Sequence, residues 1–97
     1  MKILHLTLKK QWFDMILSGE KKEEYREIKP YWSNRFIGGE TDFNQWDVIC
    51  FKNGYKKDSP KFFINLEGID IGFGKQKWGG NPDRHQYILS LGPIITL

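Results

Sequence analysis

Three ionisable side chains lie close together at Lys21, Glu24 and Arg26, in the pattern G-x-K-x-x-E-x-R that begins at Gly19. If this segment is a strand, Glu24 and Arg26 project from the same face, because the side chains of a strand alternate between its faces. A carboxylate can then orient the guanidinium through charge-assisted hydrogen bonds, while Lys21 emerges beside them at the preceding turn. Such a trio can hold an anion or the polar edge of a base.

Two further cations, Lys9 and Lys10, come shortly before this segment. They are expected in the first turn of a helix, where positive charge opposes the helix dipole. The free backbone amides at the start of a helix favour an anion, so a phosphate could be bound there by lysine and backbone together. The alternative for both residues is an ordinary position on the protein surface.

Aromatic and imidazole side chains supply the other candidate site residues. Trp78 lies in a Gly-rich segment, residues 74–84, that also carries three cationic side chains. An aromatic ring in such a loop has little core to join and suits stacking on a base. Trp12 is expected on the core face of its helix, with base stacking as the alternative. His85, at the start of the last predicted strand, is a further candidate.

The first half of the chain is predicted to contain two strands and two helices in alternation: residues 2–8, 9–18, 21–28 and a short helix from Pro30. The first helix is amphipathic, with Thr7 as its expected N-cap and Gly19 in the left-handed position that ends it. Proline suits the first turn of the second helix because it has no amide hydrogen to donate.

The second half is predicted to be a series of strands: residues 46–52, 61–72 and 86–91. Residues 38–45 are expected to form a loop, and Asn53-Gly54 indicates a hairpin turn. In the second of these strands the apolar residues change parity at Gly68, which predicts a bulge or bend there.

These elements predict an α+β fold, a small mixed or antiparallel β-barrel of about five or six strands with two short helices near the N-terminus. The chain has 97 residues, so a single domain spanning residues 1–97 is expected. Parallel βαβ winding is disfavoured, because helices do not alternate with strands through the second half.

The composition narrows the classes of partner. The net charge of +3 permits a polyanionic partner. The single cysteine, Cys50, cannot form an internal disulfide, which fits a reducing cytoplasm. No cluster with metal-ligand spacing is present in the sequence. No apolar stretch is long enough for a membrane span, so a cytoplasmic protein without membrane partners is expected.

From Thr7 to Arg26 the sequence T-L-K-K-Q-W-F-D-M-I-L-S-G-E-K-K-E-E-Y-R resembles the ASCH domains, which belong to the PUA-like group of β-barrels. The shared features are a strand, a lysine, an amphipathic helix and the G-x-K-x-x-E-x-R signature. The rest of the chain, up to the Q-Y-I-L-S-L-G ending, is similar to these domains in general character and carries a weaker motif. It implies a PUA-like barrel with a cleft beside the first helix, whose wall is lined by Lys21, Glu24 and Arg26.

The resemblance also implies a partner, namely RNA or a nucleoside or nucleotide, including modified ones. The first hypothesis is therefore a binding domain. No cofactor is expected, and a monomer is favoured although the sequence does not determine the oligomeric state. Three cations, Lys9, Lys21 and Arg26, would contact phosphate or base acceptors. Glu24 would accept hydrogen bonds from base amines or orient the guanidinium, and Trp78 would stack on a base, with His85 as a further contact.

The alternative is a small hydrolase. Some ASCH relatives deacetylate acetylated cytidine with a lysine, a threonine nucleophile three residues later, and a distal glutamate. Lys21 matches the lysine, whereas Glu24 stands at the threonine position and Asp83 is the only acid between residues 72 and 86. A hydrolase acting on acetylated cytidine or RNA would therefore use Lys21 and Glu24 as catalytic residues and water as the nucleophile.

Two other roles remain open from the sequence. Ribonuclease activity, which also occurs among ASCH relatives, would pair Lys21 with Tyr25 or His85. The third possibility is a structural domain, in which Tyr31, Trp32 and Phe36 are exposed and dock another protein.

Overall fold

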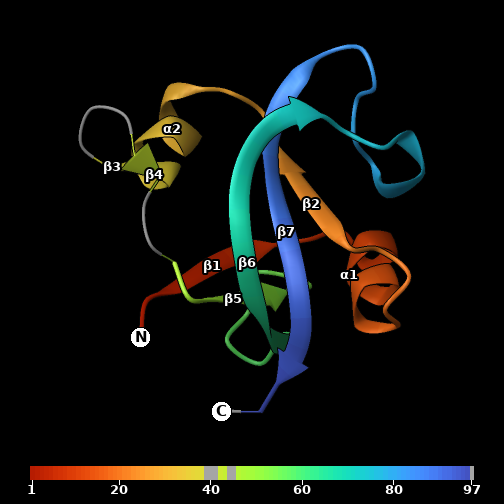
Figure 1. Ribbon diagram of the computed structural model, residues 1–97. Helices are drawn as coiled ribbons and strands as arrows, with labels where there is room; N and C mark the ends of the chain where they lie inside the picture. The colour runs from red at the N-terminus through yellow and green to blue at the C-terminus, as the bar shows by residue number, and fades with distance from the viewer. Residues whose placement is uncertain (39–41, 44–45, 97) are drawn as a thin grey trace.

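The computed structural model describes residues 1–38, 42–43 and 46–96. Its main feature is a five-stranded sheet in the order β1-β5-β6-β7-β2 (Figure 1). The strands span Ile3–Thr7 (β1), Glu23–Arg26 (β2), Val48–Lys52 (β5), Lys61–Phe73 (β6) and His85–Ile95 (β7). The remaining elements are α1 (Lys10–Leu17), α2 (Pro30–Phe36), a 3-10 turn η1 (Gln76–Trp78) and a two-stranded ribbon of β3 (Ile37–Gly38) and β4 (Asp42–Phe43).

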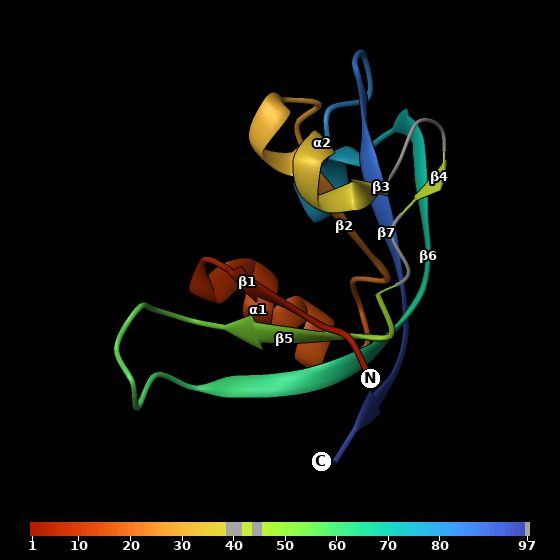
Figure 2. The same cartoon turned by 90° about the vertical axis from the view of Figure 1, so that its left-hand side faces the viewer.

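The sheet is mixed and strongly curved. β1 runs parallel to β5, and the other neighbouring strands are antiparallel. The long strands β6 and β7 bend over their whole length (Figures 1 and 2). The register of this pair shifts between Ile64 and Leu66 and again between Leu66 and Gly68, which confirms the irregularity predicted at Gly68. The result is a curled half-barrel sheet with two helices, which confirms the α+β class and is compatible with a small mixed barrel.

The core lies inside this curl. β1 alternates as its sequence predicts, with Leu4 and Leu6 buried, while β5 is buried over Val48–Phe51. Phe13 of α1 reaches the sheet, where its ring meets that of Phe62 edge-on at 4.9 Å. Burial of these large apolar side chains is the main contribution that holds α1 beside the sheet.

α2 closes the other end of the core. Phe36 is fully buried, and its ring meets that of Tyr87 edge-on at 5.1 Å. The prediction that Phe36 belongs to an exposed docking surface is therefore wrong, because the apolar face of this short helix is used for packing. Trp32 is half-buried and stacks on Phe36 at 5.5 Å, which leaves Tyr31 as the most exposed aromatic of the helix.

Several predicted boundaries differ from the structure. The N-cap of α1 is Lys9, without a side-chain cap, because Thr7 is still part of β1 and is paired with Lys52. The last strand continues through Gly92 and Pro93 to Ile95, since its second half pairs with the start of β6. Part of the predicted loop 38–45 forms the β3–β4 ribbon, and residues 39–41 and 44–45 lie outside the described residues.

Within the described part of the chain, no helix combines the length and apolar character needed to cross a membrane.

Candidate functional site

A pocket of about 660 Å³ lies where the end of β1, the start of α1, β2, the β5–β6 turn and the end of η1 meet. Its lining combines charged and aromatic side chains: Lys9, Trp12, Glu24, Arg26, Tyr55 and Trp78. Pockets of this size hold small organic ligands, and a few polar groups on an aromatic lining give such sites their specificity.

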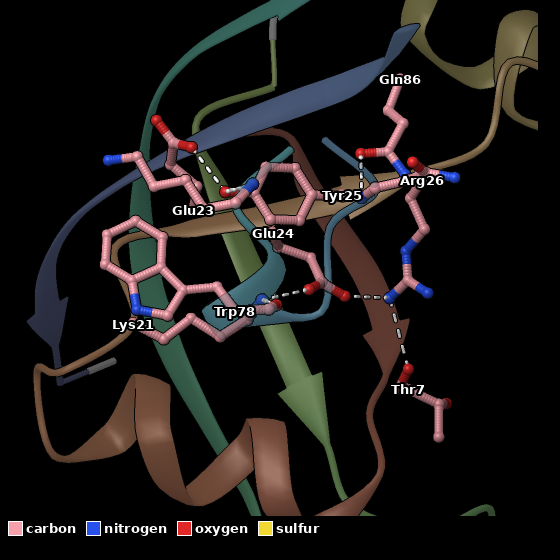
Figure 3. Close-up of polar contacts among 10 residues, drawn as sticks. Thr7, Lys21, Glu23, Glu24, Tyr25, Arg26, Trp78 and Gln86 are labelled. Carbon is pink, nitrogen blue, oxygen red and sulfur yellow. Dashed lines mark hydrogen bonds and ion pairs between the residues drawn. The ribbon is translucent and has the colours of Figure 1, made fainter. Parts of the chain in front are cut away.

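The wall from β2 carries an ion pair. Glu24 and Arg26 are alternate residues of one strand, so they share a face as predicted. Glu24 Oε2 lies 2.9 Å from Arg26 Nη2, which also donates a hydrogen bond of 3.3 Å to the backbone oxygen of Thr7 (Figure 3). The guanidinium lies over the ring of Trp32, with 5.0 Å between its central carbon and the ring centroid. These contacts fix the orientation of Arg26 at the pocket.

Lys21 forms an ion pair with Glu24 but does not line this pocket. Its Nζ lies 3.1 Å from Glu24 Oε1 and donates a hydrogen bond to the backbone oxygen of Trp78. It also lies over the rings of Trp12 and Tyr25, at 5.1 Å and 5.0 Å from their centroids. The residue is only 2% exposed. The prediction that Lys21 lines the cleft is wrong, because its ammonium lies beneath the wall and binds the protein itself.

The backbone at the end of α1 explains this placement. Gly19 adopts φ +86°, a left-handed conformation that ends the helix. The Lys21 amide then donates a hydrogen bond of 2.9 Å to the Met15 oxygen, so the chain folds back against the last turn of α1. The side chain of Lys21 is thereby directed inward, between α1 and β2.

Burial lowers the pKa of Lys21 from its ordinary value of 10.5, and the nearby Glu24 carboxylate opposes this shift. A neutral Nζ would lose part of its attraction to Glu24 but would still donate to a backbone oxygen. Lys21 therefore acts as a structural link between β2 and the segment 75–78, which contains η1.

Tyr25 forms a second link to the same segment. Its hydroxyl donates to Glu23 Oε1 at 2.7 Å and accepts a hydrogen bond of 3.1 Å from the Lys75 amide. Lys21 and Tyr25 thus hold the segment 75–78 from both ends, and this segment places Trp78 and Gly79 in the pocket wall. Burial, the largest cause, together with the bond to Glu23, raises the pKa of Tyr25.

This shift predicts a specific loss of stability at alkaline pH. Because the pKa of Tyr25 is raised on folding, its stabilising contribution is complete below pH 10, the ordinary tyrosine value, and is lost as the pH rises further. The free energy of unfolding of the wild type should therefore fall more steeply above pH 10 than that of Tyr25→Phe. Urea denaturation between pH 8 and pH 11 measures this difference.

Tyr55 provides the matched control, because it is 91% exposed and Tyr55→Phe removes a hydroxyl of the same kind. The pH profile of Tyr55→Phe should follow that of the wild type. Parallel profiles of the wild type and Tyr25→Phe up to pH 11 would contradict the raised pKa of Tyr25.

The structure places the other predicted site residues, Lys9, Trp78 and His85, in different environments. Lys9 is exposed and lines the pocket. Trp78 also lines it, but its side chain is only 7% exposed, so the expectation that it has little core to join is wrong. Its ring lies beneath the ammonium groups of Lys75 and Lys77, whose Nζ atoms are 4.5 Å and 4.9 Å from the ring centroid.

His85 is exposed and is not part of the lining. Its ring stacks on that of Phe73, with 4.6 Å between the ring centroids.

The sequence reasoning missed Tyr55 as a pocket residue. The Asn53-Gly54 signal predicts the turn but not what the turn approaches. Asn53 Nδ2 donates a hydrogen bond of 3.0 Å to the Leu8 oxygen, which ties the turn to the chain just after β1. This contact depends on the parallel pairing of β1 with β5, for which the local sequence carries no signal.

Among the described residues, no three His, Cys, Asp or Glu side chains gather as metal ligands. Comparisons of the chain with protein-family models, with curated proteins and with solved structures found no match.

Proposed function

We propose that this protein binds RNA, through a single nucleotide or nucleoside seated in the pocket between α1, β2 and the β5–β6 turn. The observation that carries the proposal is the composition of the lining, which places a fixed carboxylate–guanidinium pair beside aromatic side chains and an exposed cation, Lys9. The likeness of residues 7–26 to ASCH domains supports the same class of ligand.

The base and the phosphate of a nucleotide each have a matching group in this lining. The half-buried ring of Trp12 offers a surface for a base, which stacks on aromatic rings irrespective of its identity. Glu24 accepts hydrogen bonds from an exocyclic amine, and Arg26 donates to base or phosphate oxygens. Lys9, exposed at the start of α1, attracts a phosphate. The volume of about 660 Å³ accommodates a ligand of this size.

The position of Lys21 favours binding over hydrolysis. A general base must come within hydrogen-bond reach of the atom whose proton it removes. Lys21 Nζ instead contacts Trp78 and Glu24, is absent from the lining, and has a side chain that is 1% exposed. We therefore assign Lys21 to holding the site together, and Glu24 and Arg26 to contact with the ligand.

The proposal predicts binding of a nucleotide that depends on Lys9. Isothermal titration calorimetry with the four ribonucleoside 5′-monophosphates at low salt should detect binding of at least one of them. Lys9→Ala should weaken that binding about fivefold, because an exposed ion pair contributes at most ~1 kcal/mol. The affinity of the corresponding unphosphorylated nucleoside should not change.

Lys22→Ala is the matched control, because Lys22 is also exposed and follows the same helix but is not part of the pocket lining. It removes the same charge and should leave binding unchanged. If no monophosphate binds at low salt, or if Lys22→Ala weakens binding as much as Lys9→Ala, the proposed site is wrong. Incubation with acetylated cytidine tests the hydrolase alternative, and we expect no turnover.

A further inference from the structure

The hairpin that joins β5 to β6 carries an excess of positive charge at the edge of the pocket. Residues 52–61, here called the basic hairpin tip, contain four lysines and one acid: Lys52, Lys56, Lys57, Lys61 and Asp58. Figure 2 shows this hairpin extending beyond the end of β1, on the side where α1 begins. Positive charge therefore continues outward from the pocket, past the space that one nucleotide would fill.

An exposed aromatic ring lies within this charged segment. Tyr55 is 91% exposed, the highest value among the large hydrophobic side chains of the described residues, and it also borders the pocket. Burial in the protein therefore does not explain an aromatic residue at this position. A flat ring next to lysines is the arrangement by which proteins stack the bases of a single strand and contact its phosphates.

The tip is held in one conformation by its own hydrogen bonds. The Lys56 amide donates to Ser59 Oγ at 3.0 Å, and the Ser59 amide donates to the Lys56 oxygen at 3.1 Å. Lys52 Nζ also donates to the Lys56 oxygen, at 3.1 Å. Gly54 has φ +122°, and a Cβ at this position would lie 2.7 Å from Ser59 Oγ, so the tight turn requires glycine.

Asn53 connects this ordered tip to the pocket through its bond to the Leu8 oxygen, next to Lys9. The backbone of the turn that carries Tyr55 is thus placed beside the pocket before any ligand binds. Preorganisation of this kind reduces the entropy lost on binding.

We propose that the basic hairpin tip binds the nucleotides adjoining the one in the pocket, so that the ligand is a single-stranded polynucleotide and not a free nucleotide. This inference rests on the proposed function of the pocket. Tyr55 stacks on the base next to the seated nucleotide, and Lys56 and Lys57 contact the phosphates that follow it. Stacking on an exposed ring requires an unpaired base, which selects single strands over duplexes.

The test compares ligands of different length. Affinities are measured for a nucleoside 5′-monophosphate by calorimetry, and for a fluorescently labelled RNA octamer, the DNA octamer of the same sequence and the RNA duplex by anisotropy. The single-stranded octamer should bind more tightly than the monophosphate and the duplex. Tyr55→Ala should weaken octamer binding about tenfold, within the range found for loss of one stacked base. It should weaken monophosphate binding by a clearly smaller factor, because Tyr55 only borders the pocket. Tyr55→Phe should retain octamer binding.

Salt dependence tests the lysines separately. Replacing Lys56 and Lys57 together with alanine should reduce the slope of log K against log salt for the octamer by about 1.4, the expected value for two phosphate contacts on a single strand. The matched control is the pair Lys22→Ala and Arg84→Ala, two exposed cations that do not line the pocket or belong to the basic hairpin tip. This pair should leave the slope unchanged.

The outcomes separate the two proposals. If the monophosphate binds with dependence on Lys9, but the octamer binds no more tightly and Tyr55→Ala has no effect, only the role of the basic hairpin tip is wrong. Tighter binding of the duplex than of the single strand overturns it as well. If neither the monophosphate nor an octamer binds, both proposals fail. Loss of octamer affinity in Tyr55→Ala supports the inference for whichever strand, RNA or DNA, shows it.

Discussion

Lys21→Met is expected to lower the free energy of unfolding by about 2–3 kcal/mol, because the buried Trp78 oxygen loses a charged hydrogen-bond donor and Glu24 loses one of its two cationic partners. Methionine keeps the unbranched stem and the apolar contacts but removes the ammonium. Glu24 would then retain Arg26 at 2.9 Å as its charged partner, while the Trp78 oxygen would lose the Lys21 hydrogen bond. Urea denaturation at pH 7 measures the change.

The neighbouring Lys22→Met gives the matched control. Lys22 is exposed, so the same chemical change there should alter stability by no more than about 0.5 kcal/mol. Adding Glu24→Gln to Lys21→Met should lower stability further, because it also removes the carboxylate that pairs with Arg26. If Lys21→Met costs no more than Lys22→Met, the buried network does not support the fold as described.

Because Lys21 and Tyr25 hold the segment that forms part of the pocket wall, Lys21→Met should also weaken the proposed nucleotide binding even though Lys21 does not line the pocket. Binding is measured under conditions where the variant remains folded.

Gly79→Ala is expected to lower the free energy of unfolding by about 2–4 kcal/mol through two separate effects. Gly79 has φ +87°, a left-handed conformation that disfavours any residue with a Cβ. A Cβ at this position would also lie 2.9 Å from Cζ2 of Trp12, well inside van der Waals contact. Either Trp12 or the chain at Gly79 must shift, and both line the pocket, so affinity in the proposed nucleotide site should fall together with stability.

Gly19→Ala separates the two effects. Gly19 has nearly the same conformation, φ +86°, but a Cβ there would meet only Lys22 Nζ, at 3.9 Å. This variant therefore reports the backbone strain alone, about 1–2 kcal/mol. The excess cost of Gly79→Ala is assigned to the overlap with Trp12, and a smaller ring in Trp12→Phe should relieve it in the double variant. Equal costs at the two glycines would disprove the close contact.

Local sequence patterns were sufficient for the features that depend on near neighbours. The same-face placement of Glu24 and Arg26 follows from the alternation of a strand, and their 2.9 Å contact bears it out. The end of α1 at Gly19 follows from the freedom of glycine to take positive φ. The change of parity around Gly68 in β6 predicted the irregular register that accompanies the curl of the sheet. Each of these requires information from only a few consecutive residues.

The site depends on contacts between residues far apart in the chain, and these the sequence did not predict. Lys21 is buried because the Trp78 oxygen, 57 residues away, accepts its hydrogen bond and two aromatic rings surround it. A lysine with such partners can be buried, whereas the same charge pattern without them describes an exposed strand. Trp78 is buried in a loop that the distant residues Lys21 and Tyr25 hold in place through the Trp78 oxygen and the Lys75 amide.

The sequence by itself determined the order of the two helices and the five strands of the main sheet, the α+β class and the pairing of Glu24 with Arg26, because these follow from periodicity and turn residues. Only the tertiary structure decided that Glu24 and Arg26 line the pocket while Lys21 is buried behind its wall. It also decided that Tyr55 reaches the pocket. The physical reason is that β1 pairs in parallel with β5, from the other half of the chain. That pairing brings the β5–β6 turn beside the start of α1, and the gain in buried apolar surface that favours it comes from the whole core and not from any single segment.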